Sequence, residues 1–200
     1  MPNNPAANGS GSSTRWTERA TTPTVCRILR SRSRSATARR RWWGLCTSPV
    51  KVKSSERDGG AFLNERPLQM ASPSKSLSAS LVATGFAYYQ GAALGPHVAT
   101  LETVMNVATD VLRLGSAATD ISYVAAGRLG AYYESGLKPW DVAAAALIVQ
   151  EAGGIVCETS GQALDLFARN GATFSLNVLA AKNADIQRQM IDLLATRYTI

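Results

Sequence analysis

The sequence predicts a layered α/β fold for residues 55–200. Short apolar runs of strand length alternate there with stretches whose apolar residues recur every three or four positions, as on one face of a helix. Glycine-containing turns separate these segments, and such alternation is typical of helices packed on a sheet. With 200 residues and 46% hydrophobic content, the chain is long enough to bury one ordinary core.

The first half of this region predicts two strands and one helix. Residues 59–65 resemble a strand that enters a tight turn, continued by residues 66–68, and residues 80–86 are a short buried strand. A helix is predicted from His97 to Thr109, since its apolar residues are spaced three and four apart. The apolar face consists of Val98, Leu101, Val104 and Met105. His97, the only histidine, is predicted to be a surface or capping residue.

The second half continues the alternation. Residues 111–114 predict a strand that ends at Gly115, and Ser116 is well suited to cap a helix running to about Ala126. A strand over 130–134 and a loop over 136–139 precede an alanine-rich helix from about residue 140 to 152, which Gly153 and Gly154 terminate. Strands over 155–157 and 176–181 and an amphipathic helix over 185–194 complete the pattern.

Residues 1–54 differ in composition from the rest of the chain. They are a low-complexity mixture of Asn, Gly, Ser, Thr and Arg with no apolar period, so no regular structure is predicted for them. Nine arginines accompany the single acid Glu18 in residues 1–50. They are Arg15, Arg19, Arg27, Arg30, Arg32, Arg34, Arg39, Arg40 and Arg41. The formal net charge of +7 therefore comes from the amino-terminal segment.

Three cysteines at irregular spacing, without a CxxC pair, indicate a reducing cytoplasm rather than a disulfide framework or a zinc site. No apolar run reaches the roughly 18 residues that a membrane span needs, and the amino terminus has no continuous apolar core of a secretory signal. We therefore expect no membrane partner.

Asp141 is the acid that the pattern singles out. It lies at the start of a helix, where the macrodipole favours a carboxylate, and it would be a hard oxygen ligand for Mg²⁺. A helix cap is the alternative for a single Asp in this place. The run from Trp140 and Asp141 through four alanines to Glu151, Ala152, Gly153 and Gly154 resembles the carboxyl-terminal signature of the inositol monophosphatase family.

Other segments resemble the same family in order and spacing. They are Gly59 to Leu68, the turn at Gly115 to Ala118, and the strand from Gly130 to Glu134. The resemblance implies that Asp141 binds Mg²⁺ and touches a substrate hydroxyl, and that Glu134 accepts from a sugar hydroxyl. Gly115, Ser116 and Ala117 would line the sugar pocket. Without the resemblance, Glu134 is an acid at a sheet edge and Ser116 an ordinary cap.

The family's main metal-binding segment, Asp-Pro-Leu/Ile-Asp-Gly-Thr, is missing from residues 1–54. A shifted reading frame, in which each codon starts at the third base of the preceding codon, would permit this segment. The codons of Trp16 and Thr17 then force an aspartate. The codons of Ser10 to Ser33 permit the whole sequence Asp-Pro-Leu-Asp-Gly-Thr around that aspartate. We therefore hypothesise that residues 1 to about 50 are translated out of frame and that the family frame resumes near Ser54.

The resemblance implies a Mg²⁺-dependent phosphatase for a small sugar or polyol phosphate, of the inositol phosphate or fructose 1,6-bisphosphate class, impaired because its main metal ligands are missing. The resemblance also implies a homodimer. Two alternatives stay open: a non-catalytic homologue, and a protein whose Arg- and Ser-rich tail binds nucleic acid. The shifted frame explains the arginines without a nucleic-acid partner.

Overall fold

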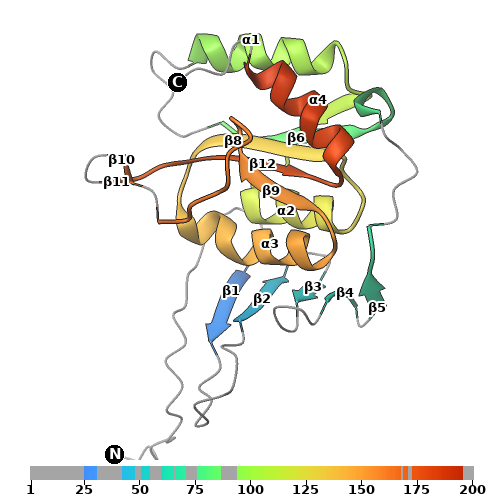
Figure 1. The fold of residues 1–200 in the computed structure, drawn as a ribbon, viewed down its shortest axis with the longest axis vertical. Coiled ribbons are helices and arrows are strands. Elements are labelled where there is room, and N and C mark those ends of the chain that lie inside the picture. The colour runs from blue at the N-terminus through green and yellow to red at the C-terminus, as the bar shows by residue number, and fades with distance from the viewer. Residues whose placement is uncertain are drawn as a thin grey trace, which may run out of the picture.

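The computed structural model describes residues 25–30, 42–47, 51–54, 60–64, 66–70, 76–86, 94–167, 169–170 and 173–195. Its described elements form four layers, namely a helix pair, a five-stranded sheet, a second helix pair and a second five-stranded sheet (Figure 1). The predicted layered α/β fold is confirmed. None of the described helices is long and apolar enough to cross a membrane.

The first sheet has the strand order β7-β6-β8-β12-β9. Strand β6 is parallel to β7 and to β8, whereas β12 is antiparallel to β8 and to β9. The bounds are β6 Leu81–Thr84, β7 Asp110–Leu112, β8 Ala131–Leu137, β9 Ile155–Glu158 and β12 Leu176–Ala181. The predicted strand over 176–181 is therefore confirmed, while β8 continues into the predicted loop because Leu137 pairs with Leu176.

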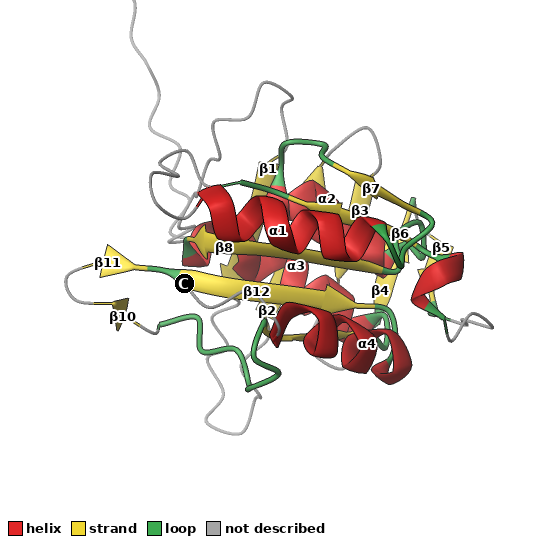
Figure 2. Ribbon diagram, turned by 90° about the horizontal axis from the view of Figure 1, so that it is seen from above, coloured by secondary structure: helices red, strands yellow, loops and turns green. Residues whose placement is uncertain are grey.

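Helices cover both faces of this sheet. Helices α1, Leu94–Met105, and α4, Ala184–Ala195, contact each other on one face, and seen from above α1 runs nearly along β8 (Figure 2). Helices α2, Ala117–Ala125, and α3, Pro139–Glu151, pack together on the other face. Adjacent residues of β8 face opposite layers, so Tyr132 is buried toward α2 and α3 and Tyr133 toward α1 and α4.

The second sheet has the strand order β1-β2-β3-β4-β5, with every neighbouring pair antiparallel. It lies against α3 and α2. Its strands are β1 Val25–Arg30, β2 Trp42–Thr47, β3 Lys51–Ser54, β4 Ala61–Leu63 and β5 Arg66–Leu68. Asn64, with a φ of 49°, turns the predicted hairpin between β4 and β5.

Three of these strands lie where the sequence predicts no regular structure. Strands β1, β2 and β3 belong to residues 1–54, and the lack of a local apolar period did not indicate them. They pair with one another in chain order, and contacts outside the segment complete the sheet, because β3 pairs with β4 and all three strands contact α3. A pattern inside the segment cannot reveal the contacts with β4 and α3. The division of the chain at Ser54 stays a prediction.

Helix α1 buries a different face from the predicted one. His97, Thr100 and Val104 are buried, whereas Val98 is 52% exposed and Met105 is 55% exposed. The prediction of His97 as a surface or capping residue is therefore wrong. The buried face is set by contacts with α4 and β7, which no spacing within the helix can specify.

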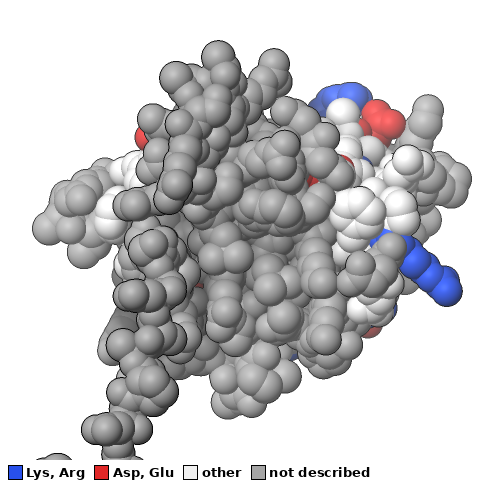
Figure 3. Space-filling model, turned by 90° about the horizontal axis from the view of Figure 1, so that it is seen from below, with Lys and Arg blue, Asp and Glu red and all other residues white. Residues whose placement is uncertain are grey.

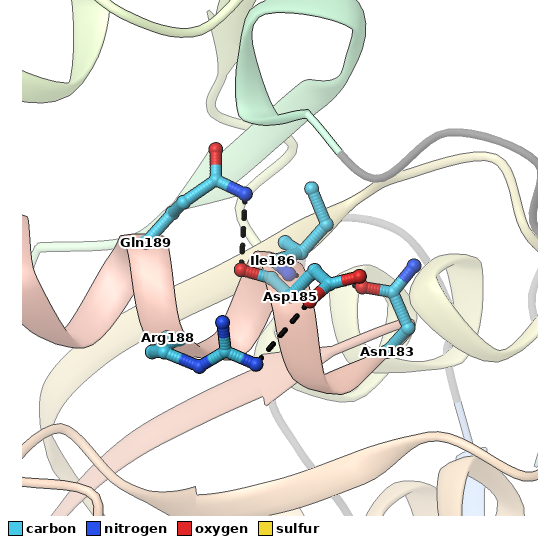
Figure 4. Close-up of polar contacts among 5 residues, drawn as sticks. All are labelled: Asn183, Asp185, Ile186, Arg188 and Gln189. Carbon is cyan, nitrogen blue, oxygen red and sulfur yellow. Dashed lines mark hydrogen bonds and ion pairs between the residues drawn. The ribbon is translucent and has the colours of Figure 1, made fainter.

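Helix α4 is fixed at its start by local hydrogen bonds (Figure 4). The side-chain oxygen of Asn183 accepts from the Ile186 N–H at 2.9 Å, and the Gln189 side-chain amide donates to the Asp185 carbonyl at 3.0 Å. Gln189 also accepts from the backbone N–H of Leu77 at 3.0 Å, which ties the short 3₁₀ turn η1, Leu77–Ala79, to this helix. Arg188 and Asp185 of this helix form an ion pair. The pair is exposed, so it adds little stability.

The remaining pair of described strands is a short hairpin that projects beyond the end of the first sheet (Figure 2). Strand β10, Arg169–Asn170, pairs with β11, Thr173–Phe174. The hairpin directly precedes β12 and brings Phe174 next to the start of α3.

Candidate functional site

The topology of the first sheet predicts a ligand crevice at the ends of β6 and β7. Strand β6 has β7 on one side and β8 on the other, and the connecting helices α1 and α2 lie on opposite faces of the sheet. In open α/β sheets, ligands bind at such a switch point, outside the carboxyl ends of the strands. Gly85 and Phe86 follow β6 here, and Arg113 follows β7.

Glu134 of β8 is half-buried beside this switch point. Its Oε2 accepts a short hydrogen bond from the Tyr132 hydroxyl. The pKa of the Glu134 carboxyl is raised, mainly by burial and to a smaller extent by the charge of Asp141. The hydrogen bond from Tyr132 and the charge of Arg113 act in the opposite direction and lower this pKa. Glu134 does not lie at a sheet edge, because β8 pairs with both β6 and β12, so the reading of Glu134 as an edge acid is wrong.

A row of three side chains joins the end of β7 to helix α1. The Arg113 guanidinium lies 5.6 Å from the centroid of the Phe86 ring, and the Phe86 and His97 rings meet edge to face at 6.2 Å. Burial lowers the pKa of His97. Arg113 therefore holds a positive charge at the rim of the crevice, where it also acts on Glu134.

Asp141 is the third residue of α3 and closes the first turn of the helix. Its Oδ2 accepts from the Lys138 N–H at 2.8 Å, and its own N–H donates to the Lys138 carbonyl at 2.9 Å. Pro139 occupies the first helical position, where no N–H is required. Burial raises the pKa of Asp141, while the hydrogen bond from the Lys138 backbone and the Lys138 charge lower it. The capping role is confirmed, with Lys138 rather than Asp141 at the N-cap position.

The β10–β11 hairpin contacts the same helix terminus. The Trp140 and Phe174 rings meet edge to face at 6.3 Å, and the Lys138 ammonium donates to the Phe174 carbonyl at 2.5 Å. Trp140 is 37% exposed. This hairpin therefore supports the turn that carries Asp141 from outside the helix.

The turn at Gly115, Ser116 and Ala117 begins α2. Gly115 has a φ of +88°, and a Cβ built there would meet nothing within 4 Å, so the backbone conformation is what favours glycine. The Ser116 hydroxyl oxygen accepts from the Thr119 N–H at 3.4 Å and from the Thr119 hydroxyl at 3.2 Å, which confirms its cap. Ala117, the first residue of α2, is buried in the core. Their role in a sugar pocket stays a prediction.

The metal-binding capacity of the described residues is limited. Within these ranges, no group of three His, Cys, Asp or Glu side chains could hold a metal ion. Asp141 commits Oδ2 to the Lys138 amide, which leaves Oδ1 as its second possible donor. Mg²⁺ requires a near-octahedral set of oxygen ligands, so the described residues do not fit a complete magnesium centre.

Three residues of the crevice were not found by sequence reasoning. Gly85, Arg113 and Tyr132 meet at Glu134 from three strands or strand ends. Only Tyr132 could have been found from the sequence. It precedes Glu134 by two positions on the same predicted strand, so the two side chains lie on the same face of the sheet. The approach of Gly85 and Arg113 depends on the order of strands in the sheet.

Comparison with known proteins adds an independent observation. A family model described as "Inositol monophosphatase family" matches residues 43–192. An inositol-1-monophosphatase of Mesorhizobium japonicum is 42% identical over 111 residues, covering 56% of this chain and 41% of that protein. "Nus factor SuhB" of Haemophilus influenzae is 37% identical over 149 residues, covering 74% of this chain and 53% of that protein.

A solved structure agrees with the sequence comparison. The inositol monophosphatase of Anabaena (Nostoc) sp. PCC 7120 superposes with a TM-score of 0.70 at 28% identity, over 87% of this chain and 64% of that one. The chain thus spans about two fifths to one half of the length of the curated relatives named above. The matched region starts at residue 43, ahead of the predicted boundary at Ser54.

Proposed function

Because the chain belongs to the inositol monophosphatase family, whose model matches residues 43–192, we propose that it carries the polyol-binding part of a Mg²⁺-dependent phosphatase. The substrate class is a small sugar or polyol phosphate monoester. The observation that supports this most directly is the pair Glu134 and Asp141, two partly buried carboxylates that interact electrostatically at the switch point of the sheet. Carboxylate oxygens accept hydrogen bonds from hydroxyl groups, as a polyol requires.

We propose the division of roles that the family resemblance implies. Glu134 accepts from a substrate hydroxyl, and Asp141 offers Oδ1 to a hydroxyl or to the metal. Gly115, Ser116 and Ala117 bound the pocket at the start of α2, where the helix terminus favours an anionic group. When bound, Mg²⁺ would supply an activated water and neutralise charge on the phosphate. Since the described residues do not form a complete magnesium centre, we expect impaired hydrolysis.

Binding and turnover should be measured separately. We expect the chain to bind myo-inositol 1-phosphate by calorimetry, and Glu134→Gln to weaken this binding about tenfold, as losing a charge-assisted hydrogen bond does. Glu102→Gln, an exposed change on α1, is the matched control. Phosphate release from inositol phosphate and fructose 1,6-bisphosphate, with and without Mg²⁺, tests impairment. Phosphate release as fast as in active family members would overturn the expected impairment of hydrolysis. Absence of inositol phosphate binding would overturn the proposed substrate class.

We further propose that the missing metal ligands are encoded in the shifted frame upstream of Ser54. Codon degeneracy permits Asp-Pro-Leu-Asp-Gly-Thr in a gene whose frame is shifted by one base before this point and restored near residue 54. We expect its product to gain Mg²⁺-dependent phosphatase activity over the present chain. An equal shift that also replaces both aspartates of that segment by asparagine is the control. No gain of activity, or an equal gain in the control, would contradict the hypothesis.

We also expect the chain to form a homodimer in the cytoplasm. Helix α1 supports this: Leu94, Val98 and Met105 are 46%, 52% and 55% exposed, and its only charged residue is Glu102. Two copies would meet there with little charge repulsion. Light scattering coupled to size exclusion tests it. A monomer at micromolar concentration would contradict the expectation, and Val98→Lys should weaken the dimer.

The names of some relatives favour a second candidate, a non-catalytic or nucleic-acid-related role, because several are called Nus factors. The described charged side chains seen from the side of the β1–β5 sheet lie toward the periphery of that face and include both signs (Figure 3). RNA retention that falls steeply with salt and disappears on deletion of residues 1–54 would support this candidate. Retention unchanged by the deletion would exclude the tail as the binding element.

A further inference from the structure

The Glu134 carboxylate is confined by the backbone of Gly85, the residue that follows β6. A Cβ built on Gly85 would overlap the carboxylate group, with Oε1 at 2.5 Å and with Cδ and Oε2 closer still. Real Cβ atoms do not approach other atoms so closely, and every residue except glycine carries a Cβ. The carboxylate therefore occupies the space that a side chain at position 85 would fill.

The second constraint is the hydroxyl of Tyr132. Tyr132 and Glu134 are two residues apart on β8 and share a face of the sheet. The Tyr132 side chain is wholly buried among residues of α2 and α3, so its hydroxyl has a fixed position. It donates to Oε2 of Glu134. Within the described part of the chain, Oε1 of Glu134 accepts no hydrogen bond.

The two constraints act on different degrees of freedom. Gly85 lets the carboxylate lie against the strand, and Tyr132 fixes its rotation by holding one of the two oxygens. A free glutamate loses side-chain rotamer entropy when it binds a ligand, whereas a glutamate already held in place has lost it on folding. Among the described residues, the charged groups that act on Glu134 are Arg113, after β7, and Asp141, on α3.

We propose that Tyr132 and Gly85 are positioning residues that leave Oε1 of Glu134 as the single acceptor for one hydroxyl of the substrate. The inference rests on the proposed function and narrows its substrate class. A carboxylate with both oxygens free can accept from both hydroxyls of a vicinal diol, one at each oxygen. With Oε2 held between Tyr132 and Gly85, the site selects for one hydroxyl at this position.

The hydrogen bond can be tested without any ligand. Tyr132→Phe removes only the hydroxyl, and Tyr133→Phe removes the hydroxyl of the neighbouring buried tyrosine on the opposite face of the same strand. In ¹³C-glutamate-labelled protein, with the signal assigned by Glu134→Gln, we expect the Glu134 titration midpoint to move to higher pH in Tyr132→Phe and to stay in place in Tyr133→Phe. Equal midpoints in the two variants would overturn the proposal.

Gly85→Ala provides a second route to the same conclusion if Tyr132→Phe does not fold. The added Cβ must displace the carboxylate, so we expect the Glu134 signal to shift and its titration to change. An unchanged Glu134 signal and titration in a folded Gly85→Ala variant would also overturn the proposal.

Ligand binding separates this inference from the proposed function. We expect Tyr132→Phe to weaken binding of myo-inositol 1-phosphate about tenfold and to leave inorganic phosphate unaffected, since only the polyol end meets Glu134. Removing one inositol hydroxyl at a time should show one position whose loss matches that of Glu134→Gln. Two such positions would overturn single-hydroxyl recognition. A native chain that binds no inositol phosphate overturns the proposed function, and the titration still decides whether Tyr132 holds Glu134.

Discussion

Oδ2 of Asp141 accepts a hydrogen bond from the backbone N–H of Lys138 at 2.8 Å, so the acid proposed to bind metal and substrate also closes the first turn of α3. The two roles use different atoms, because the cap occupies Oδ2 only. Substitutions at this position can therefore separate stability from binding.

We expect Asp141→Ala to lower the free energy of unfolding by about 1 kcal/mol, since it removes a helix cap. Asp141→Asn should lose less stability, because an amide oxygen can still accept from Lys138. Both variants should lose inositol phosphate binding in the presence of Mg²⁺. Urea denaturation and calorimetry measure the two effects. Equal stability of Asp141→Ala and the native chain would contradict the capping role.

The pH dependence of stability near neutrality should belong to His97, the only histidine of the chain. Burial lowers the pKa of His97 in the folded state, so below the ordinary value of 6.5 the unfolded chain binds more protons than the folded one. Stability should therefore fall as the pH drops from 6.5 toward the folded pKa. Denaturation curves should show this slope in the native chain and a flatter one in His97→Gln. The same slope in the native chain and in His97→Gln would contradict the assignment of this pH dependence to His97.

The observed orientation of α1 predicts opposite outcomes for two valines. Val104 is fully buried, so Val104→Ala should lower the free energy of unfolding by about 2 kcal/mol. Val98 is 52% exposed, so Val98→Ala should change it by less than about 0.5 kcal/mol. Urea denaturation of dilute protein, where self-association does not contribute, checks both. Similar large losses in both variants would support the face predicted from sequence, which contains both valines.

The contact between Lys138 and the hairpin predicts a local change in dynamics. Lys138→Met removes the donor to the Phe174 carbonyl and keeps the length of the side chain. We expect faster hydrogen exchange at Phe174 and at the residues before β12, with the core strands unchanged. Lys182→Met, at the end of β12, serves as the control. Unchanged exchange in Lys138→Met would show that the contact between the Trp140 and Phe174 rings holds the hairpin alone.

Local signals predicted the elements that local chemistry determines. Ser116 caps α2 as its side chain and its place after a glycine indicated, and Gly153, with a φ of +89°, ends α3 as expected. The strand at 176–181 was predicted from its run of mostly apolar residues. In each case the information lies within a few neighbouring residues.

Non-local contacts account for what the sequence did not reveal. The buried side of α1 depends on α4, which follows about 80 residues later, and the strands before Ser54 depend on β4 and α3. The candidate site shows the same division. Glu134 and Asp141 were found from the motif that contains them, whereas Gly85 and Arg113 reach Glu134 only because β6 lies between β7 and β8.

The position of β12 in the first sheet bears on how the protein folds during synthesis. This strand, the last in sequence among those described, lies between β8 and β9, and it is the sheet partner of β9. Until residue 181 has left the ribosome, one side of β8 is unpaired and β9 has no partner, so apolar strand faces stay open to chaperones and proteases. A late-made central strand of this kind raises contact order and slows folding. Residues up to 181 must leave the ribosome before the first sheet can close.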